Sequence, residues 1–411
     1  MNSLSYQKNK LFFDQLDLEE LSKGVTTPFY LYSENLIKQN IKDYITQSND
    51  KTLFCYSVKA NSNLSILKLI ASGGMGFDVV SKGELYRVIK AGGDTSKVVY
   101  SGVGKTRAEI RYALENNILC FNVESEGELF VINDEASNMD TTANISIRVN
   151  PDVAVESHPY ISTGMKDNKF GITYKNALAL YKKASKLSSL NIIGIDFHIG
   201  SQITSIQPYI DSIKSIRSLV SDLKKENITI THIDVGGGLG IPYEGEDIVG
   251  KADYIKEITD SLKDLNVNII FEPGRSVVGD CGLLVTQIQY IKESETKNFM
   301  IIDASMSELI RPPLYNAFHK ITPIIKRDKS YKIFDIVGPV CESADFLGKE
   351  RSMNSEVYDL LVIEDVGAYG FVLSSNYNTR PKPAEYIIQN GCIEEIRSAD
   401  TLDQILTNEI K

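Results

Sequence analysis

The feature that most constrains this 411-residue sequence is a pattern repeated between Thr52 and Arg275. In each repeat a short apolar run rich in β-branched residues is followed by a turn and then by a stretch with helical amphipathicity. Several runs are apolar nearly throughout, which is typical of strands covered on both faces. The apolar run occurs eight times, at Thr52–Val58, Gly76–Val80, Val98–Gly102, Leu119–Val123, Ile145–Val149, Ile192–Phe197, Thr231–Val235 and Asn268–Phe271.

Eight strand–helix repeats within roughly 250 residues predict a (β/α)8 TIM barrel. A doubly wound parallel sheet is the alternative, and the count of eight and the even spacing favour the barrel. An earlier apolar run, Phe29–Tyr32, and the helix after it are expected to lead into the barrel. After Gly279 runs of strands replace the alternation, which predicts a second, mainly antiparallel β domain. We therefore expect an N-terminal segment over residues 1–30 that packs with the β domain, the barrel over 31–280 and the β domain over 281–411.

Composition excludes several classes of partner. The chain carries 54 acidic and 44 basic residues, a net charge of −10 that repels a phosphate backbone, so we expect no nucleic-acid partner. No apolar run approaches the ~20 residues that cross a bilayer, and the N-terminus lacks the apolar core of a secretory signal. The five cysteines are odd in number and widely spaced without a CxxC pair. They indicate a protein of the reducing cytoplasm with no disulfide framework and no metal site.

Chemically distinctive residues fall where the predicted strands end. A barrel enzyme carries its reactive groups just past the C-terminal ends of its strands, so a shared position there matters more than any one residue. The residues at these ends, or on the strand itself for Asp78, are Lys59, Asp78, Asn150, His198, Gly236–Gly238 and Glu272–Arg275.

Two of these positions indicate a cofactor. Lys59 follows an apolar strand, where partial loss of solvation favours the neutral amine that forms a Schiff base, although such a lysine is more often a surface residue. The glycines at 236–238 let backbone N–H groups approach an anion, and with Gly274 and Arg275 they follow strands seven and eight, where barrels often bind phosphate. A pair of tight turns is the alternative. A phosphate site opposite a strand-end lysine indicates pyridoxal 5′-phosphate (PLP).

Two further residues fit the same cofactor. A carboxylate at Glu272 would keep the pyridine nitrogen protonated, and the alternative is a salt bridge to Arg275. His198 would stack on the ring, and the alternative is a core histidine. The remaining histidines lack metal-ligand spacing and are predicted to be structural or peripheral: His158, His232 and His319.

These motifs resemble those of the fold-type III PLP-dependent decarboxylases, which join an alanine-racemase-like barrel to a C-terminal β domain. The resemblance rests on Tyr56–Asn61, Phe77–Ser81, His198–Gln202, Gly236–Gly240 and Glu272–Arg275. It narrows to the members that convert meso-2,6-diaminopimelate to L-lysine and CO2, the last step of lysine biosynthesis. Four segments carry this narrower match, and the similarity spans roughly residues 25 to 390: His158–Gly171, Arg311–His319, Cys341–Asp345 and Gly367–Gly370.

The resemblance implies roles for individual residues. Lys59 would hold PLP covalently, His198 would lie on its ring, and Cys341 would be the acid that reprotonates the α-carbon; these three are the expected catalytic residues. The expected cofactor-binding residues are Lys59, Asp78, His198, Ser201, Gly237, Gly238, Glu272, Gly274, Arg275 and Tyr369. The expected substrate-binding residues are Arg275, Arg311, Tyr315, Glu342 and Tyr369.

The resemblance also implies a homodimer in which Cys341 and Glu342 enter the active site of the partner subunit. The distal end of diaminopimelate brings a carboxylate and an ammonium, which arginines and Glu342 would bind. Alternatives are a bend packed by an aromatic for Arg311 and Tyr315, and an inert thiol for Cys341. A related decarboxylase of carboxynorspermidine, ornithine or arginine, or a non-catalytic PLP-binding protein, also stays open. The β domain and the Cys341–Glu342 segment argue against the non-catalytic protein, because a carrier needs neither.

Overall fold

The computed structural model describes residues 4–151 and 169–410, and the chain divides into two compact units. The β unit comprises residues 1–39, 242–246 and 277–411. The barrel unit comprises residues 40–241 and 247–276. Most of the His158–Gly171 segment, residues 158–168, lies outside the described residues. The domain limits expected at residues 30 and 280 stay a prediction.

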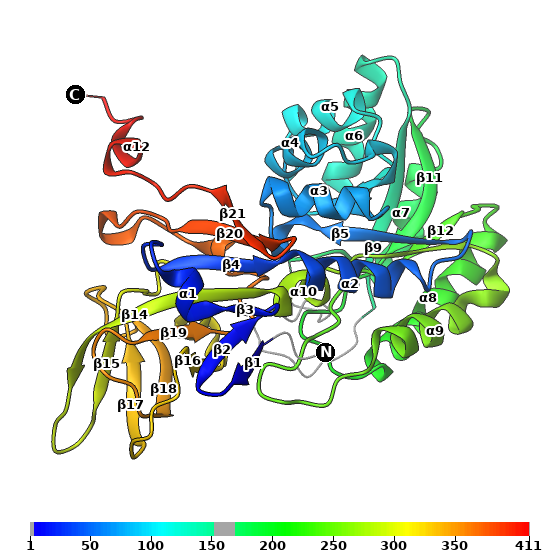
Figure 1. Cartoon of the computed structure of the whole chain (residues 1–411). Helices are drawn as coiled ribbons and strands as arrows, with labels where there is room; N and C mark the ends of the chain where they lie inside the picture. The colour runs from blue at the N-terminus through cyan, green and yellow to red at the C-terminus, as the bar shows by residue number, and fades with distance from the viewer. Residues whose placement is uncertain (1–3, 152–168, 411) are drawn as a thin grey trace. The chain divides into compact units, whose positions relative to one another are not determined.

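The barrel unit is built on a closed ring of eight parallel strands. Figure 1 shows strands of this unit running between its helices. Strand β9 pairs with β8 on one side and β11 on the other, while β13 pairs with β5, so the ring has no free edge. This closure confirms the barrel and rules out the doubly wound sheet, and each predicted apolar run overlaps one of its strands. The ring strands are β5 (Thr52–Ser57), β6 (Gly76–Val79), β7 (Val98–Tyr100), β8 (Cys120–Val123), β9 (Ala143–Asn150), β11 (Leu190–Asp196), β12 (His232–Asp234) and β13 (Asn268–Phe271); the two-residue β10 (Ile172–Thr173) adds to the end of β9.

Helices connect successive barrel strands, and most begin at a hydroxyl or amide side chain. Ser81, Thr106 and Ser125 each accept a hydrogen bond from the third backbone N–H of the helix that follows, and Thr106 forms a complete capping box with Glu109. Such caps satisfy N–H groups that have no partner inside the helix. The barrel helices are α3 (Leu64–Ser72), α4 (Lys82–Lys90), α5 (Arg107–Glu115), α6 (Glu126–Asn138), α7 (Tyr174–Ala184), α8 (Gln207–Lys225) and α9 (Lys251–Leu262).

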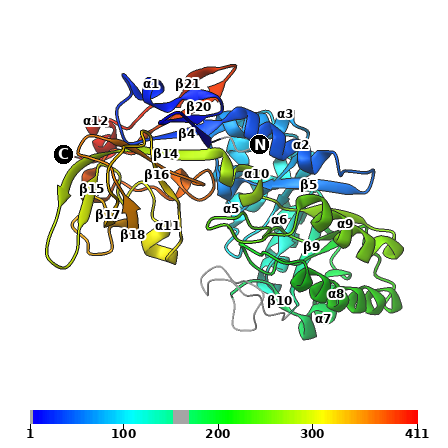
Figure 2. The same cartoon turned by 60° about the horizontal axis from the view of Figure 1, so that its bottom comes forward.

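The β unit contains a nine-stranded, mainly antiparallel sheet (Figure 2). Its central path runs β18-β17-β15-β14-β4-β20-β21, with β19 also paired to β14 and β16 paired to β19. Two of the pairings are parallel, β15 with β17 and β4 with β20. The strands are β4 (Phe29–Ser33), β14 (Gly282–Lys292), β15 (Phe299–Ile302), β16 (Ile321–Pro323), β17 (Lys332–Val337), β18 (Phe346–Met353), β19 (Leu360–Ile363), β20 (Ala384–Gln389) and β21 (Cys392–Arg397); the short helices are α10 (Arg275–Val278), which begins in the barrel unit, α11 (Arg311–Tyr315) and α12 (Leu402–Leu406).

Strand β4 corrects one expectation. The run Phe29–Tyr32 does not lead into the barrel, because β4 lies in the second sheet between β14 and β20. All five of its residues are buried, so the apolar run identifies a strand without identifying its partners. The helix after it, α2 (Glu34–Ile45), is the segment that reaches the first barrel strand: Tyr44 packs against Phe54 with ring centroids 5.3 Å apart.

The N-terminal residues pack with the β unit. They form a three-stranded antiparallel sheet of β1 (Leu4–Gln7), β2 (Lys10–Phe13) and β3 (Leu16–Asp17), followed by α1 (Leu18–Ser22). Leu11, Phe13 and Leu18 are buried in one apolar cluster with residues of β4 and β14. Across the described residues, every helix is too short or too polar to traverse a bilayer.

Candidate active site

The residues expected at the barrel strand ends converge in the barrel unit. Lys59 lies in a single 3-10 turn, Val58–Ala60, directly after β5, and Asp78 is buried within the neighbouring strand β6. Lys59 Nζ forms an ion pair with the Asp78 carboxylate. The single hydroxyl proton of Ser57 is shared between the same carboxylate, 2.9 Å from Oγ, and the Glu272 carbonyl oxygen, 3.0 Å from Oγ, so the ends of β5, β6 and β13 are linked.

Glu272 belongs to a group of buried acids at the C-terminal ends of the neighbouring strands β11, β12 and β13. Carboxylate oxygens of Asp196, Asp234 and Glu272 all lie within 4.8 Å of one another. Burial, and then the charges of Asp234 and Asp78, raise the pKa of Glu272 well above its usual range, and burial raises the pKa of Asp234 to about 7. Carboxyl groups this close in a buried site cannot all ionise, so the group holds protons at neutral pH.

Gly236–Gly238 and the turn Gly274–Arg275 form what we call the glycine cradle, a set of backbone N–H groups and one guanidinium. Arg275 is buried and donates from Nη2 to Ser201 Oγ at 2.9 Å. A Cβ on Gly237 would lie 2.1 Å from the Glu272 carbonyl oxygen, and a Cβ on Gly238, whose φ is +107°, would lie 2.4 Å from the Gly200 carbonyl oxygen. A Cβ on Gly274 would meet Ser57 Cβ at 3.1 Å. The close approach of these backbones therefore requires residues without side chains.

His198 follows β11 and is held in its neutral form. Its Nδ1 accepts a hydrogen bond from the Gly237 backbone N–H at 3.2 Å, so this nitrogen carries no proton. Burial, and then the charges of Arg148 and Lys59, lower the pKa of His198 well below its usual value. An uncharged imidazole is therefore placed beside the glycine cradle.

The other expected site residues lie in the β unit. Arg311 and Tyr315 begin and end helix α11, with Arg311 buried and Tyr315 half-buried. Tyr369 has a left-handed backbone, with φ of 56°. Cys341 and Glu342 are exposed; Cys341 donates its backbone N–H to Asn378 Oδ1 at 3.4 Å, and Glu342 Oε1 accepts the Tyr377 hydroxyl at 2.6 Å.

Sequence reasoning missed several charged residues that surround the barrel site. Asp196 and Asp234 join Glu272 in the acid group, and Arg148 pairs with Glu124 at 2.7 Å and approaches Asp196 at 3.8 Å. Each of them is buried. The signal that would have found most of them is the one that identified Asp78, a charged residue inside or directly after an otherwise apolar strand.

The barrel site fits PLP on its own chemistry. It offers an amine at Lys59, a glycine cradle that a Cβ would fill, a buried arginine beside it and a group of acids that retain protons. Within the described part of the chain, the buried oxygens Asp78 Oδ1 and Asp234 Oδ2 lack a hydrogen-bond partner. A phosphate ester, an aldehyde and a pyridine nitrogen are the groups that such a donor set accommodates.

Comparison with known proteins identifies the family of the chain. The family described as "Pyridoxal-dependent decarboxylase, pyridoxal binding domain" matches residues 34–279. Because this match covers more than half of the chain, the protein belongs to the pyridoxal-dependent decarboxylases.

Relatives that match nearly the whole chain identify one family among the pyridoxal-dependent decarboxylases. The diaminopimelate decarboxylase of Vibrio cholerae is 46% identical over 408 residues, which cover 98% of each chain. The crystal structure of diaminopimelate decarboxylase from Helicobacter pylori complexed with L-lysine has a TM-score of 0.92 at 42% identity and covers 96% of this chain and 99% of that one. The enzyme from M. jannaschii in co-complex with L-lysine has a TM-score of 0.94 at 36% identity, covering 100% and 98%. The chain therefore belongs to the diaminopimelate decarboxylase family.

Proposed function

We propose that this protein is a PLP-dependent carboxy-lyase that converts meso-2,6-diaminopimelate to L-lysine and CO2, the last step of lysine biosynthesis. The observation that carries the proposal is the 46% identity to a diaminopimelate decarboxylase over 98% of both chains. Two related structures that hold L-lysine, the expected product, match the fold at TM-scores of 0.92 and 0.94.

The barrel unit would hold the cofactor. Lys59 would bind it covalently through Nζ, Asp78 and Glu272 would face its ring, and neutral His198 would lie against one ring face. The phosphate would be held by Ser201, Gly237, Gly238, Gly274 and Arg275, and Tyr369 would contribute from the β unit. When bound, PLP supplies an electron sink for the electron pair left on the substrate α-carbon.

The reaction breaks one carbon–carbon bond and forms one carbon–hydrogen bond. The bond from the α-carbon to its carboxylate breaks, CO2 leaves, and the electron pair stays on the α-carbon. Cys341 would donate a proton to this carbon, and the thiol would be restored by a proton from solvent. Glu272, as a carboxylate, would keep a proton at the ring nitrogen.

Substrate recognition would depend on the end of diaminopimelate that does not react. This end carries a carboxylate and an ammonium. Arg275 and Arg311 would bind the carboxylate, since a guanidinium matches a carboxylate with two parallel hydrogen bonds, and Tyr315 and Tyr369 would line the same pocket. Glu342 would neutralise the ammonium.

We also propose that the protein acts as a homodimer in the cytoplasm. Cys341 and Glu342 are exposed on the β unit, which suits residues that complete the site of a partner subunit. All five cysteines are free, which suits a reducing compartment.

A decarboxylation assay tests the reaction. CO2 release is measured with meso-diaminopimelate, lysine, ornithine and arginine, each with and without added PLP. We expect release from diaminopimelate, dependence on PLP, and loss of both turnover and the visible absorbance of bound cofactor in Lys59→Ala. Equal turnover on ornithine or arginine, or full turnover by folded Lys59→Ala, would contradict the proposal.

Mixing inactive variants tests the shared site. Lys59→Ala and Cys341→Ala are each expected to lose most activity. If each site combines Lys59 of one subunit with Cys341 of the other, unfolding and refolding them together restores up to about a quarter of wild-type activity, because half the dimers are mixed and carry one intact site. Mixtures that stay inactive while forming mixed dimers would show that the two residues act within one subunit.

A further inference from the structure

Arg311 lies beside His319, a residue that has no role in the proposed reaction. The guanidinium is buried, and its Nη1 lies 2.8 Å from His319 Nε2. His319 is fully buried, and its Nδ1 lies 2.8 Å from the Glu364 backbone carbonyl oxygen. These two hydrogen bonds link the end of strand β19 to helix α11 through one imidazole ring.

The two partners determine the protonation of this imidazole. A guanidinium has no acceptor, so His319 Nε2 must accept from Arg311 and carries no proton. A carbonyl oxygen has no proton to give, so His319 Nδ1 must donate to Glu364. His319 is therefore the neutral tautomer with its proton on Nδ1, and only this form satisfies both bonds.

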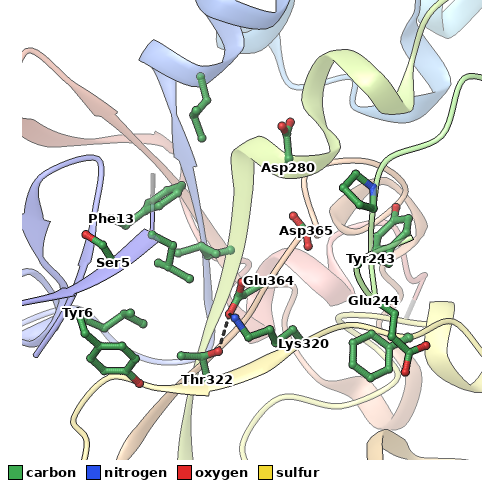
Figure 3. A pocket seen from close by; sticks show the side chains of 17 residues that line it. Ser5, Tyr6, Phe13, Tyr243, Glu244, Asp280, Lys320, Thr322, Glu364 and Asp365 are labelled. Carbon is green, nitrogen blue, oxygen red and sulfur yellow. Dashed lines mark hydrogen bonds and ion pairs between the residues drawn. The ribbon is translucent and has the colours of Figure 1, made fainter. Parts of the chain in front are cut away.

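The Tyr243 ring contacts both Arg311 and His319. Its ring centroid lies 4.7 Å from the Arg311 guanidinium carbon and 5.2 Å from the His319 ring centroid, with the two rings at 78°. A guanidinium over a tyrosine ring is attracted by the negative face of that ring. Tyr243 also lines a cavity of about 650 Å³ in the β unit, together with Glu364 (Figure 3).

Tyr243 belongs to a short excursion of the chain. Residues 242–246 are part of the β unit although they follow strand β12 of the barrel unit, a few residues after the glycine cradle. The segment that supplies Gly237 and Gly238 therefore continues directly into the residue that packs on Arg311. The sequence pattern alone does not predict the contact between Tyr243 and Arg311.

We propose that His319 and Tyr243 are positioning residues that fix the Arg311 guanidinium in the orientation that receives the carboxylate of the unreactive end of the substrate. His319 does this by accepting one N–H of Arg311, and Tyr243 by presenting its ring to the guanidinium carbon at 4.7 Å. These two contacts thereby restrict the rotation of the guanidinium. The inference rests on the proposed function, since it takes Arg311 as a substrate ligand.

Substitution of His319 tests the proposal in the PLP-loaded enzyme. His319→Leu removes the acceptor at similar volume, whereas His319→Gln supplies an amide oxygen close to the position of Nε2. A hydrogen bond to a charged group contributes enough to predict a rise of about 10- to 100-fold in KM for diaminopimelate in His319→Leu, with kcat changed less than KM. We expect His319→Gln to stay within about threefold of wild type.

Two binding probes separate positioning from general damage to the site. L-lysine retains the carboxylate that Arg311 would bind, and 1,5-diaminopentane lacks it. Calorimetry should show that His319→Leu weakens L-lysine binding by the same factor as it raises KM and leaves 1,5-diaminopentane binding unchanged. Tyr243→Leu should weaken L-lysine binding in the same selective way, which keeps the test open if His319→Leu does not fold.

His232→Gln is the matched control. His232 is also buried, and burial lowers its pKa to about 4, but it lies at the start of strand β12 in the barrel unit. Substitution of His232 should leave the ratio of the dissociation constants for L-lysine and 1,5-diaminopentane unchanged. If folded His319→Leu and Tyr243→Leu both bind L-lysine as wild type does, the inference is overturned; if wild type itself fails to decarboxylate diaminopimelate, the proposed function fails instead.

Discussion

The substitution Gly237→Ala tests the glycine cradle. A Cβ at this position would lie 2.1 Å from the Glu272 carbonyl oxygen, whereas a carbon and an oxygen normally approach no closer than about 3.3 Å. One of the two backbones must therefore move by roughly 1 Å. Glu272 is poorly able to move, because its N–H is bonded to the Gly236 carbonyl at 2.8 Å and its own carbonyl accepts Ser57 Oγ.

Such overpacking in a well-packed site costs typically about 1–3 kcal/mol. Since about 1.4 kcal/mol corresponds to tenfold in an equilibrium constant, we expect Gly237→Ala to weaken PLP binding by roughly 5- to 150-fold and to lower the urea midpoint of unfolding. PLP binding is followed by the visible absorbance of the bound cofactor during dialysis against decreasing PLP concentrations. Unfolding is followed by far-ultraviolet circular dichroism.

Gly127→Ala is the control for this experiment. Gly127 lies in the first turn of helix α6, and a Cβ there would meet nothing within 4 Å. Alanine is the better helix former by up to about 1 kcal/mol, so stability should stay the same or rise and PLP binding should not change. If Gly237→Ala retains both the midpoint and the PLP dissociation constant of wild type, the steric argument for the cradle is wrong.

Two further predictions concern stability. Burial, and then the charges of Glu364 and Asp280, raise the pKa of Asp365 to about 7 in the folded protein. Between pH 4 and 7 the folded state therefore holds a proton that the unfolded state has lost. The free energy of unfolding should fall as the pH rises through this range, by up to about 1.4 kcal/mol per pH unit. Asp365→Asn should remove this part of the slope in urea unfolding across that range, and asparagine suits the left-handed backbone there (φ 58°); an unchanged slope would count against the assigned shift. Phe271→Ala should lower the free energy of unfolding by about 3–5 kcal/mol, because the fully buried ring packs on Phe54 and Tyr254 at centroid distances of 5.3 and 5.7 Å; a loss below about 1 kcal/mol would mean that the site refills.

Much of the barrel was predictable because its two periodicities are local. A strand buried on both faces and an amphipathic helix each show their pattern within about a dozen residues, and their alternation determines which ends of the strands share one edge. Lys59, Asp78 and Glu272 were identified by that edge alone, and the structure brings them together. The closed ring confirms the fold class in the same way.

The predictions that failed or were missing depend on contacts between distant segments. The run Phe29–Tyr32 has the same pattern in either sheet, and only its pairing with β14 and β20 decides where it belongs. Asp196 and Asp234 lie inside predicted strands, yet their closeness to Glu272 follows from ring closure and not from spacing. The sequence predicts a structural or peripheral role for His319, whereas its bond to Arg311 depends on the folded loop after α11.

The position of β4 has a consequence for how the protein is synthesised. The eight ring strands follow one another along the chain from Thr52 to Phe271, so the barrel can close as soon as the eighth strand has left the ribosome. Strand β4 emerges before all of them, but its partners begin only at Gly282 and Ala384. A strand that is fully buried in the folded protein therefore has no sheet to join while most of the chain is being translated, and during that interval it is exposed to wrong pairing or to capture by a chaperone.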